Sequence, residues 1–176
     1  AESINITELR GKPEQASKDL EELIEMASKN DGWVYELQNY FYKANKLDLA
    51  VKLLLKGRER SKDPNKFDTQ LARAYLYLDL KDKMLEEVLN FGVRAKNFDY
   101  VQGTVQDNIK TEKEIEMLEN TLYSRIQANP EETYYSEILI WHYSQKSDFA
   151  RAFIQARSLD QRQKLQGFKI FELAEK

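Results

Sequence analysis

Apolar and polar positions follow a helical period along the stretch from Thr133 to Gln166. Apolar side chains step by three or four residues in two runs, first Tyr135, Ile138, Leu139 and Tyr143, then Phe149, Ala152, Phe153 and Ala156. This spacing is typical of a helix with one buried face. The polar segment between the runs is short, and Ser147 or Asp148 is suited to cap the second helix. The pattern predicts two antiparallel helices whose apolar faces need further neighbours.

The same pattern recurs through the chain in steps of 34 residues, without insertion or deletion. Repeats then start at residues 31, 65, 99 and 133, with another start at 167. Four register positions are apolar throughout: position 7 (Leu37, Leu71, Val105, Leu139, Leu173), position 11 (Phe41, Tyr75, Ile109, Tyr143), position 20 (Ala16, Ala50, Met84, Leu118, Ala152) and position 24 (Leu20, Leu54, Val88, Leu122, Ala156). These columns predict the core. They indicate a single domain over 1–176, made of a partial repeat (1–30), four repeats (31–64, 65–98, 99–132, 133–166) and a truncated repeat (167–176).

Composition supports helices and no sheet. The chain has 176 residues, of which 41% are hydrophobic and 32% charged, with only six glycines and three prolines. Leu, Glu, Lys, Ala and Gln fill the space between the polar turns, and these residues favour helix. No alternating stretch flanked by turn residues indicates a strand. The predicted fold class is therefore all-α, an α-solenoid of antiparallel helix pairs.

Several helix ends can be predicted from single residues. Pro13 suits a first helical turn, and Asn30 or Asp31 suits a cap. Asp63-Pro64 predicts a helix starting near residue 65, with the aspartate as its cap. Thr111 followed by Glu114 has the spacing of a capping box. Gly103 predicts that the helix around it is short.

The 34-residue helix–turn–helix period resembles the tetratricopeptide repeat (TPR). The resemblance is clearest in Leu37, Phe41, Ala50 and Leu54, and again in Leu139, Tyr143 and Ala152. It implies a right-handed superhelix in which the first helix of each repeat lines a concave groove. Because the chain opens and closes in mid-repeat, with Ile4–Arg10 as the remnant of a first helix, we expect it to be a segment of a longer TPR protein.

The resemblance also implies which side chains face the groove. Repeat by repeat they are Tyr35, Asn39, Tyr42 and Lys43; then Lys66, Thr69, Arg73, Leu76 and Tyr77; then Tyr100 and Asp107; and finally Tyr134, Glu137, Trp141 and Gln145. Aromatic side chains and arginine are enriched at binding hot spots. Each tyrosine either contacts a partner or completes the packing between helices. We expect a non-catalytic scaffold that binds a peptide or protein in the groove.

Charge and composition exclude several other functions. The net charge of −3 disfavours nucleic acid, which is bound through a basic excess. The basic segment 56–62 is interpreted as the solvated end of a helix. The chain has no cysteine, so disulfides, thiolate catalysis and Cys-ligated zinc are excluded. No apolar run approaches the ~20 residues of a membrane span.

No pattern indicates catalysis, a metal or a cofactor. The only histidine, His142, is interpreted as structural, because the sequence nominates no partner for it. The carboxylates of Glu112, Glu114, Glu116 and Glu119 are interpreted as a solvated helix face. Glycine-rich phosphate loops, nucleophile elbows and EF-hand loops are missing. We therefore expect no enzyme activity, no metal and no cofactor.

Two alternative roles remain open. The chain could be a structural or oligomerisation segment that binds through the open ends of the solenoid, making homo-oligomers. It could also be a helical-repeat RNA binder, which the acidic balance disfavours. Among TPR subclasses, the carboxylate clamp for chaperone C-termini is not predicted, since only Asn39 matches its pattern. The identity of the partner and the compartment cannot be inferred from the sequence.

Overall fold

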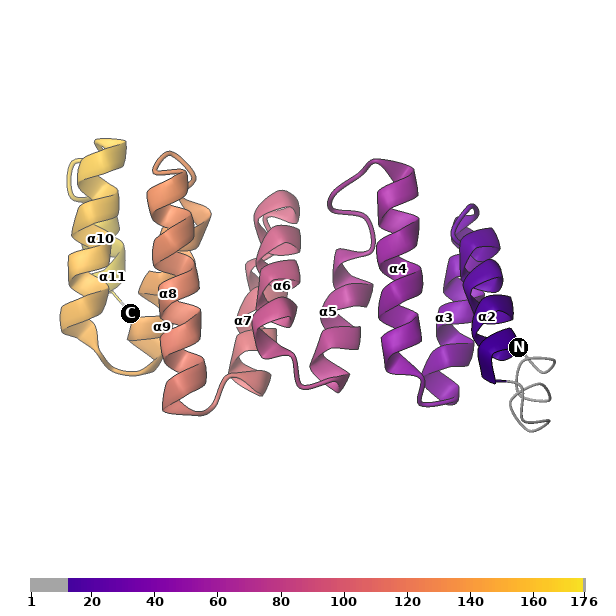
Figure 1. Cartoon of the computed structure of the whole chain (residues 1–176). Helices are drawn as coiled ribbons and strands as arrows, with labels where there is room; N and C mark the ends of the chain where they lie inside the picture. Colours follow the sequence, from indigo (N-terminus) through magenta and orange to yellow (C-terminus); the bar gives the residue numbers. More distant parts are fainter. Residues whose placement is uncertain (1–12, 176) are drawn as a thin grey trace. The chain divides into compact units, whose positions relative to one another are not determined.

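The computed structural model describes residues 13–175, and every regular element in that range is an α-helix (Figure 1). The helices are α2 (Pro13–Ala27), α3 (Asp31–Lys43), α4 (Leu47–Ser61), α5 (Asp68–Tyr77), α6 (Lys81–Ala95), α7 (Phe98–Asn108), α8 (Glu112–Ala128), α9 (Tyr134–Gln145), α10 (Phe149–Gln163) and α11 (Phe168–Ala174). The predicted all-α fold is confirmed. The expectation for Ile4–Arg10 lies outside the described residues.

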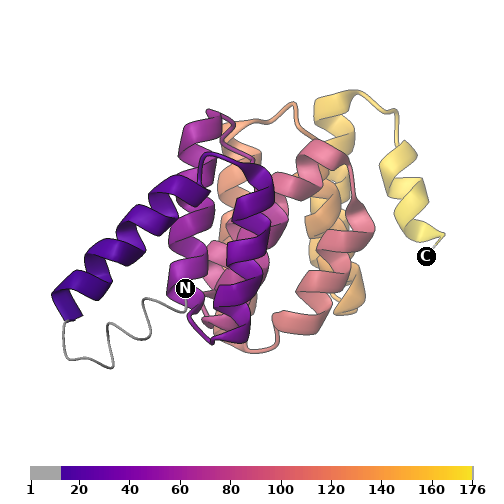
Figure 2. The same ribbon diagram turned by 90° about the vertical axis from the view of Figure 1, so that its right-hand side faces the viewer.

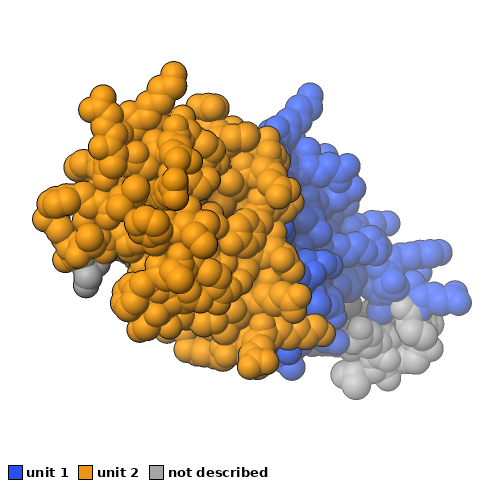
Figure 3. All heavy atoms as spheres, turned by 90° about the vertical axis from the view of Figure 1, so that its left-hand side faces the viewer, with its two compact units in different colours: residues 1–87 blue, residues 88–176 orange. Residues whose placement is uncertain are grey.

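The chain forms two compact units, residues 1–87 and residues 88–176, which Figure 3 colours blue and orange. The division falls inside α6. In the first unit α2 packs against both α3 and α4, and α4 packs against α5; α2 is inclined to α3 in Figure 2. In the second unit α8 packs against α9, α9 against α10, and α10 against α11. The pairs α4–α5, α8–α9, α9–α10 and α10–α11 are therefore formed by helices that are consecutive in the sequence.

The apolar columns predicted from the sequence form the cores of the two units. Most of their side chains are buried, namely Ala16, Phe41, Ala50, Leu54, Leu71, Tyr75, Met84, Val88, Val105, Ile109, Leu118, Leu122, Leu139, Tyr143, Ala152 and Ala156. Leu20, Leu37 and Leu173 are half-buried. Removal of this apolar surface from water is the main favourable term in forming each unit.

Three predicted helix caps are present. The Asn30 side chain accepts a hydrogen bond from Trp33 N at the start of α3, and Asp148 accepts one from Arg151 N at the start of α10. At α8, Thr111 Oγ1 accepts from Glu114 N, and the Glu114 carboxylate accepts from Thr111 N at 2.9 Å. Each bond satisfies a backbone N–H that has no partner inside its helix.

Helix α5 starts later than the sequence predicts. Asp63 does not cap it; its carboxylate accepts a hydrogen bond from Asn65 N in a turn, and the helix begins at Asp68. Phe67 precedes it with a φ of 65°, a conformation that disfavours a side chain. Phe67 is nevertheless buried, and its ring lies so close to Gly57 that a Cβ there would be 2.8 Å away. Burial of the Phe67 ring therefore determines where α5 begins, although the Asp63-Pro64 pair favours an earlier start.

Positive φ angles recur in the 34-residue register. Asn45, Asp79 and Ser147 share one register position, after the ends of α3, α5 and α9. Lys62, Lys96 and Lys164 share another, at the ends of α4, α6 and α10. Left-handed residues commonly end helices. The predicted repeat at 99–132 has no positive φ angle at either register position. At the first of them its second helix has already begun, at Glu112, and at the other stands Pro130, whose ring fixes φ at a negative value.

The interpretation of segment 56–62 as solvated is wrong for Arg58. Its Nη1 and Nη2 donate to the two carboxylate oxygens of Glu87 on α6, at 2.8 and 2.7 Å, and its Nε donates to Lys66 O at 2.7 Å. The Arg58 and Glu87 side chains are only 15% and 10% exposed. This planar, two-point ion pair joins α4 to α6 in the first unit and fixes the connection before α5.

Candidate binding surfaces

The first unit has a surface hollow of about 580 Å³ between the C-terminal parts of α3 and α5, here called the Arg73 hollow. Its lining is Asn39, Tyr42, Lys43, Asn45, Leu47, Arg73 and Tyr77. Five residues predicted to face a groove therefore lie together, namely Asn39, Tyr42, Lys43, Arg73 and Tyr77. Asn39 and Tyr42 share a face of α3, and Arg73 and Tyr77 share a face of α5, because residues three or four apart are neighbours on a helix surface. The packing of the first unit brings these two faces together.

Arg73 is held in place by two tyrosines. Its guanidinium carbon lies 5.5 Å from the ring centroids of both Tyr42 and Tyr77. Its Nε and Nη2 donate to Tyr77 Oη at 3.4 and 3.3 Å. The two rings meet edge to face, with centroids 5.8 Å apart, and burial raises the pKa of Tyr42. The two tyrosines thus hold the guanidinium in place.

Tyr35, another predicted groove residue, lies apart from the lining of this hollow. It is exposed, and its ring packs edge-on against Phe67 at 5.7 Å. Its hydroxyl accepts a hydrogen bond from Gln70 Nε2 at 3.4 Å. Tyr35 therefore covers the buried Phe67 on the surface of α3 and α5.

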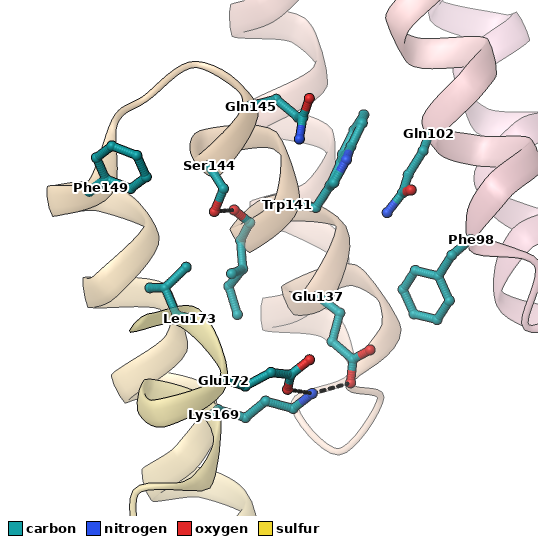
Figure 4. Close-up of a pocket in the computed structure, with 11 residues that line it drawn as sticks. Phe98, Gln102, Glu137, Trp141, Ser144, Gln145, Phe149, Lys169, Glu172 and Leu173 are labelled. Carbon is teal, nitrogen blue, oxygen red and sulfur yellow. Dashed lines mark hydrogen bonds and ion pairs between the residues drawn. The ribbon is translucent and has the colours of Figure 1, made fainter. Parts of the chain in front are cut away.

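The second unit has a hollow of about 380 Å³, here called the Trp141 hollow (Figure 4). It is lined from α7, α9, α10 and α11 by Phe98, Gln102, Glu137, Ile140, Trp141, Ser144, Gln145, Phe149, Lys169, Glu172 and Leu173. Three residues predicted to face a groove, Glu137, Trp141 and Gln145, lie on one face of α9 here. Figure 4 shows the indole of Trp141 between Gln145 and the side chains of α7.

A lysine lies between two carboxylates at one edge of the Trp141 hollow. Lys169 Nζ is 2.9 Å from Glu172 Oε2 and 3.5 Å from Glu137 Oε1. Burial alone lowers the pKa of Lys169, but the hydrogen bond to Glu172 and the charges of Glu137 and Glu172 outweigh it and raise that pKa. The cation is therefore already neutralised by the protein, and the remaining surface of this hollow is aromatic, aliphatic and uncharged polar.

Helix α11 is positioned by a buried carboxylate on α10. Asp160 Oδ1 accepts a hydrogen bond from Gly167 N at 2.8 Å, and Oδ2 accepts one from Lys169 N at 3.0 Å. Gly167 has a φ of 93°, which a side chain disfavours. Asp160 thereby satisfies the first backbone donors of α11 and directs this helix toward the hollow.

One predicted binding residue is wrong. Tyr134 is only 1% exposed, so it cannot contact a partner. Its hydroxyl donates to Asn97 O at 2.8 Å, and its ring packs on Phe98 with centroids 4.3 Å apart. Burial raises its pKa. Tyr134 completes the packing of α9 on α6 and α7, the alternative that the sequence left open for each tyrosine.

Most of the residues that line the Trp141 hollow were not among the predicted groove residues. The same groove positions, counted from residue 167, correspond to Phe168 and Phe171, which do not line the hollow. Lys169, Glu172 and Leu173, each one or two positions on, line it instead. The contacts of Asp160 and the left-handed Gly167 set the rotation of α11, and the 34-residue register does not encode them.

His142 has a partner that the sequence did not nominate. It is buried, and its Nε2 lies 3.2 Å from Glu119 Oε1 on α8. Arg151 Nη1 on α10 donates to the other oxygen of Glu119 at 3.1 Å. Interpreting Glu119 as solvated is therefore wrong; its carboxylate links α9 and α10 to α8. Helical spacing cannot reveal a contact between residues so far apart in sequence.

Lowering the pH from about 7.5 to 5.5 should destabilise the second unit through His142. Burial is the main cause that lowers the pKa of His142, Lys146 and Arg151 lower it further, and Glu119 opposes them only in part. The unfolded chain, with a histidine pKa of about 6.5, then binds more protons than the folded chain, so stability falls as the pH drops through 6.5. Urea unfolding at several pH values measures this.

The variant His142→Gln provides the control for this pH dependence. His142 is the chain's only histidine, so the variant should show a much flatter dependence between pH 5.5 and 7. An equal slope in both proteins would contradict the assignment. A slope of the opposite sign would mean that Glu119 dominates the pKa.

Over residues 13–175, no cluster of three or more His, Asp or Glu side chains is placed to hold a metal ion. Within the same residues, no helix combines the length and apolar composition needed to cross a membrane. None of the protein-family models, curated proteins and solved structures compared with the chain matches it.

Proposed function

We propose that the chain is a non-catalytic protein-interaction module of the TPR type, which binds extended peptide segments of a partner in the Arg73 and Trp141 hollows. One observation carries the proposal: eight of the fifteen groove residues predicted from the repeat register line these two hollows, five in one and three in the other. The hollows have the volumes of sites that take one or a few side chains, in the lower part of the ~300–1,000 Å³ range for ligand pockets.

The chemistry of the lining favours a peptide. In the Trp141 hollow an indole, two phenyl rings and two aliphatic side chains offer apolar contact, and Gln102 and Gln145 offer amides for backbone groups. Tryptophan and tyrosine present large contact areas with few rotatable bonds, so that little conformational entropy is lost on binding. We expect the occupant to place an apolar or aromatic side chain against Trp141.

Selection of peptides from a random display library, followed by fluorescence polarisation of the selected peptides, tests this function. We expect Trp141→Ala to weaken binding by at least about tenfold, the usual effect of truncating a central aromatic anchor. Trp33→Ala is the matched control, because Trp33 is 56% exposed on α3 and lines neither hollow. Selection of no peptide, or equal losses in both variants with unchanged circular dichroism, would contradict the proposal.

A specific observation also favours self-association as a second role. Phe168 and Phe171 on α11 are 62% and 63% exposed, an unusual exposure for such rings. Apart from residues already in ion pairs (Arg151, Glu21 and Glu25), the neighbouring α10 carries Arg157 and Arg162, whereas α2 carries Glu14, Asp19 and Glu22. This charge complementarity suits the α10–α11 face of one copy to the α2 face of another.

Light scattering over a dilution series tests self-association. We expect the mass to rise with concentration in the wild type and to stay that of a monomer in Phe168→Ser/Phe171→Ser. A monomer at all concentrations up to about 1 mM would rule this role out, since binding weaker than millimolar is worth only about 4 kcal/mol.

A further inference from the structure

The Arg73 hollow has an unbalanced positive charge. Its lining contains two cations, Arg73 and Lys43, and no carboxylate. Among the described residues neither cation forms an ion pair, whereas other cations of the first unit do: Lys66 Nζ is 2.7 Å from Asp31 and Arg58 is bonded to Glu87. The chain as a whole is acidic, with a net charge of −3. Two unpaired cations in one hollow of an acidic protein leave room for an anion from outside.

Arg73 is also positioned in advance of any ligand. Stacking between Tyr42 and Tyr77 and the two hydrogen bonds to Tyr77 Oη restrict a side chain that would otherwise be mobile. The bonds use Nε and Nη2, so Nη1 keeps its donors for a ligand. A guanidinium held in one orientation loses less conformational entropy on binding a carboxylate or a phosphate.

The other lining residues define what accompanies the anion. Asn39 and Asn45 carry amides that can bond to a peptide backbone, and Leu47 and the tyrosine rings offer apolar contact. The lining as a whole therefore suits a peptide in which one anionic side chain is followed or preceded by an uncharged residue. The Trp141 hollow differs, because Glu137 and Glu172 already neutralise Lys169 there.

We propose that the Arg73 hollow binds an anionic side chain of a peptide, a carboxylate or a phosphate bonded to Arg73 and Lys43. The inference rests on the proposed function and adds to it the chemical class of the ligand. The anion is a side chain within the peptide, not its C-terminal carboxylate, because the carboxylate-clamp pattern is present only at Asn39.

Titration of the ¹⁵N-labelled chain with short peptides tests the inference. The probes are Ala-Tyr-Glu-Leu-Ala, the same peptide with Gln at the centre, and the same peptide with phosphoserine at the centre. All are acetylated and amidated, so that the central side chain is the only anion. The signal followed is the Arg73 Nε–H resonance. We expect an anionic peptide to bind at least about fivefold more tightly than the Gln peptide at low salt, and the preference to shrink as salt screens it.

The variant Arg73→Gln should remove this preference, and Arg157→Gln is the control. Arg157 is an exposed arginine of α10 outside both hollows, and its loss changes the net charge equally. For Arg73→Gln, the backbone amide resonances of Tyr42 and Tyr77 replace the lost Arg73 signal. Preference for the Glu peptide identifies a carboxylate as the source of the anion, and preference for phosphoserine alone identifies a phosphate.

Three results would overturn the inference: equal binding of all three peptides, a preference that survives Arg73→Gln, or no shift at Arg73 with any peptide. None of these results would contradict the proposed function, which is peptide binding in general. Peptide binding as such is measured separately, by the library selection and the Trp141→Ala variant.

Discussion

Replacing Gly92 by alanine should destabilise the second unit by about 2–4 kcal/mol, although alanine favours helix over glycine by about 1 kcal/mol. Gly92 is buried in α6. A Cβ atom there would lie 2.3 Å from Val101 Cγ2 and 2.5 Å from Tyr134 Oη. Neither neighbour can yield, since Val101 is fully buried and the Tyr134 hydroxyl is bonded to Asn97 O. Overpacking a dense core forces such groups out of their preferred geometry.

Gly103→Ala is the matched control for Gly92→Ala. Gly103 is also a helical glycine of the second unit, but a Cβ atom there would meet nothing within 4 Å. This substitution should stabilise the unit by about 0.5–1 kcal/mol, through helix propensity alone. The two changes therefore carry opposite expected signs. Urea unfolding followed by Trp141 fluorescence, in a Trp33→Phe background, reports on this unit. A Gly92→Ala protein as stable as wild type would contradict the packing described here.

Glu87→Ala should destabilise the first unit by about 2–4 kcal/mol. The substitution leaves the Arg58 guanidinium 15% exposed and without its carboxylate. A charge that is largely removed from water and has lost its partner costs far more than the net contribution of the intact pair. Arg58 also donates to Lys66 O, so we expect the connection between α4 and α5 to loosen as well.

A double variant and an exposed pair test this interpretation. Arg58→Met/Glu87→Leu removes both charges and should cost less than Glu87→Ala alone, because no unpaired charge remains. Glu21→Ala breaks the ion pair between Glu21 and Lys52, two side chains that are each about half exposed. This substitution should lower the free energy of unfolding by less than about 1 kcal/mol. Trp33 fluorescence in a Trp141→Phe background follows the unfolding of the first unit. A double variant less stable than Glu87→Ala would show that the pair itself is strongly stabilising.

Features that depend on helical periodicity could be predicted from the sequence. The apolar columns at positions 11, 20 and 24 identified buried residues correctly, with Leu20 half-buried, because burial of one helix face repeats every three to four residues. Caps at Asn30, Thr111 and Asp148 were also correct, since a cap is a contact between residues close in sequence.

Features that depend on contacts distant in sequence could not be predicted. The start of α5 is set by Phe67 filling the space over Gly57, which overrides Asp63-Pro64. Tyr134 has the register position of a groove residue but points into the core over the small Gly92. The lining residues of α11 depend on a bond from Asp160 on another helix. In each case a tertiary contact, and not the local sequence, decided the outcome.

The lysines with positive φ angles have a consequence for the order of folding. Lys62, Lys96 and Lys164 end their helices in a conformation that a lysine disfavours on its own. An isolated α6 or α10 would therefore have no local reason to stop at Lys96 or Lys164, and its last turn would fluctuate. The left-handed conformation that ends the helix becomes stable only when the next helix packs against it. We therefore expect helix pairs, not single helices, to be the smallest cooperative folding units of the chain, with the helix ends acquiring protection against hydrogen exchange last.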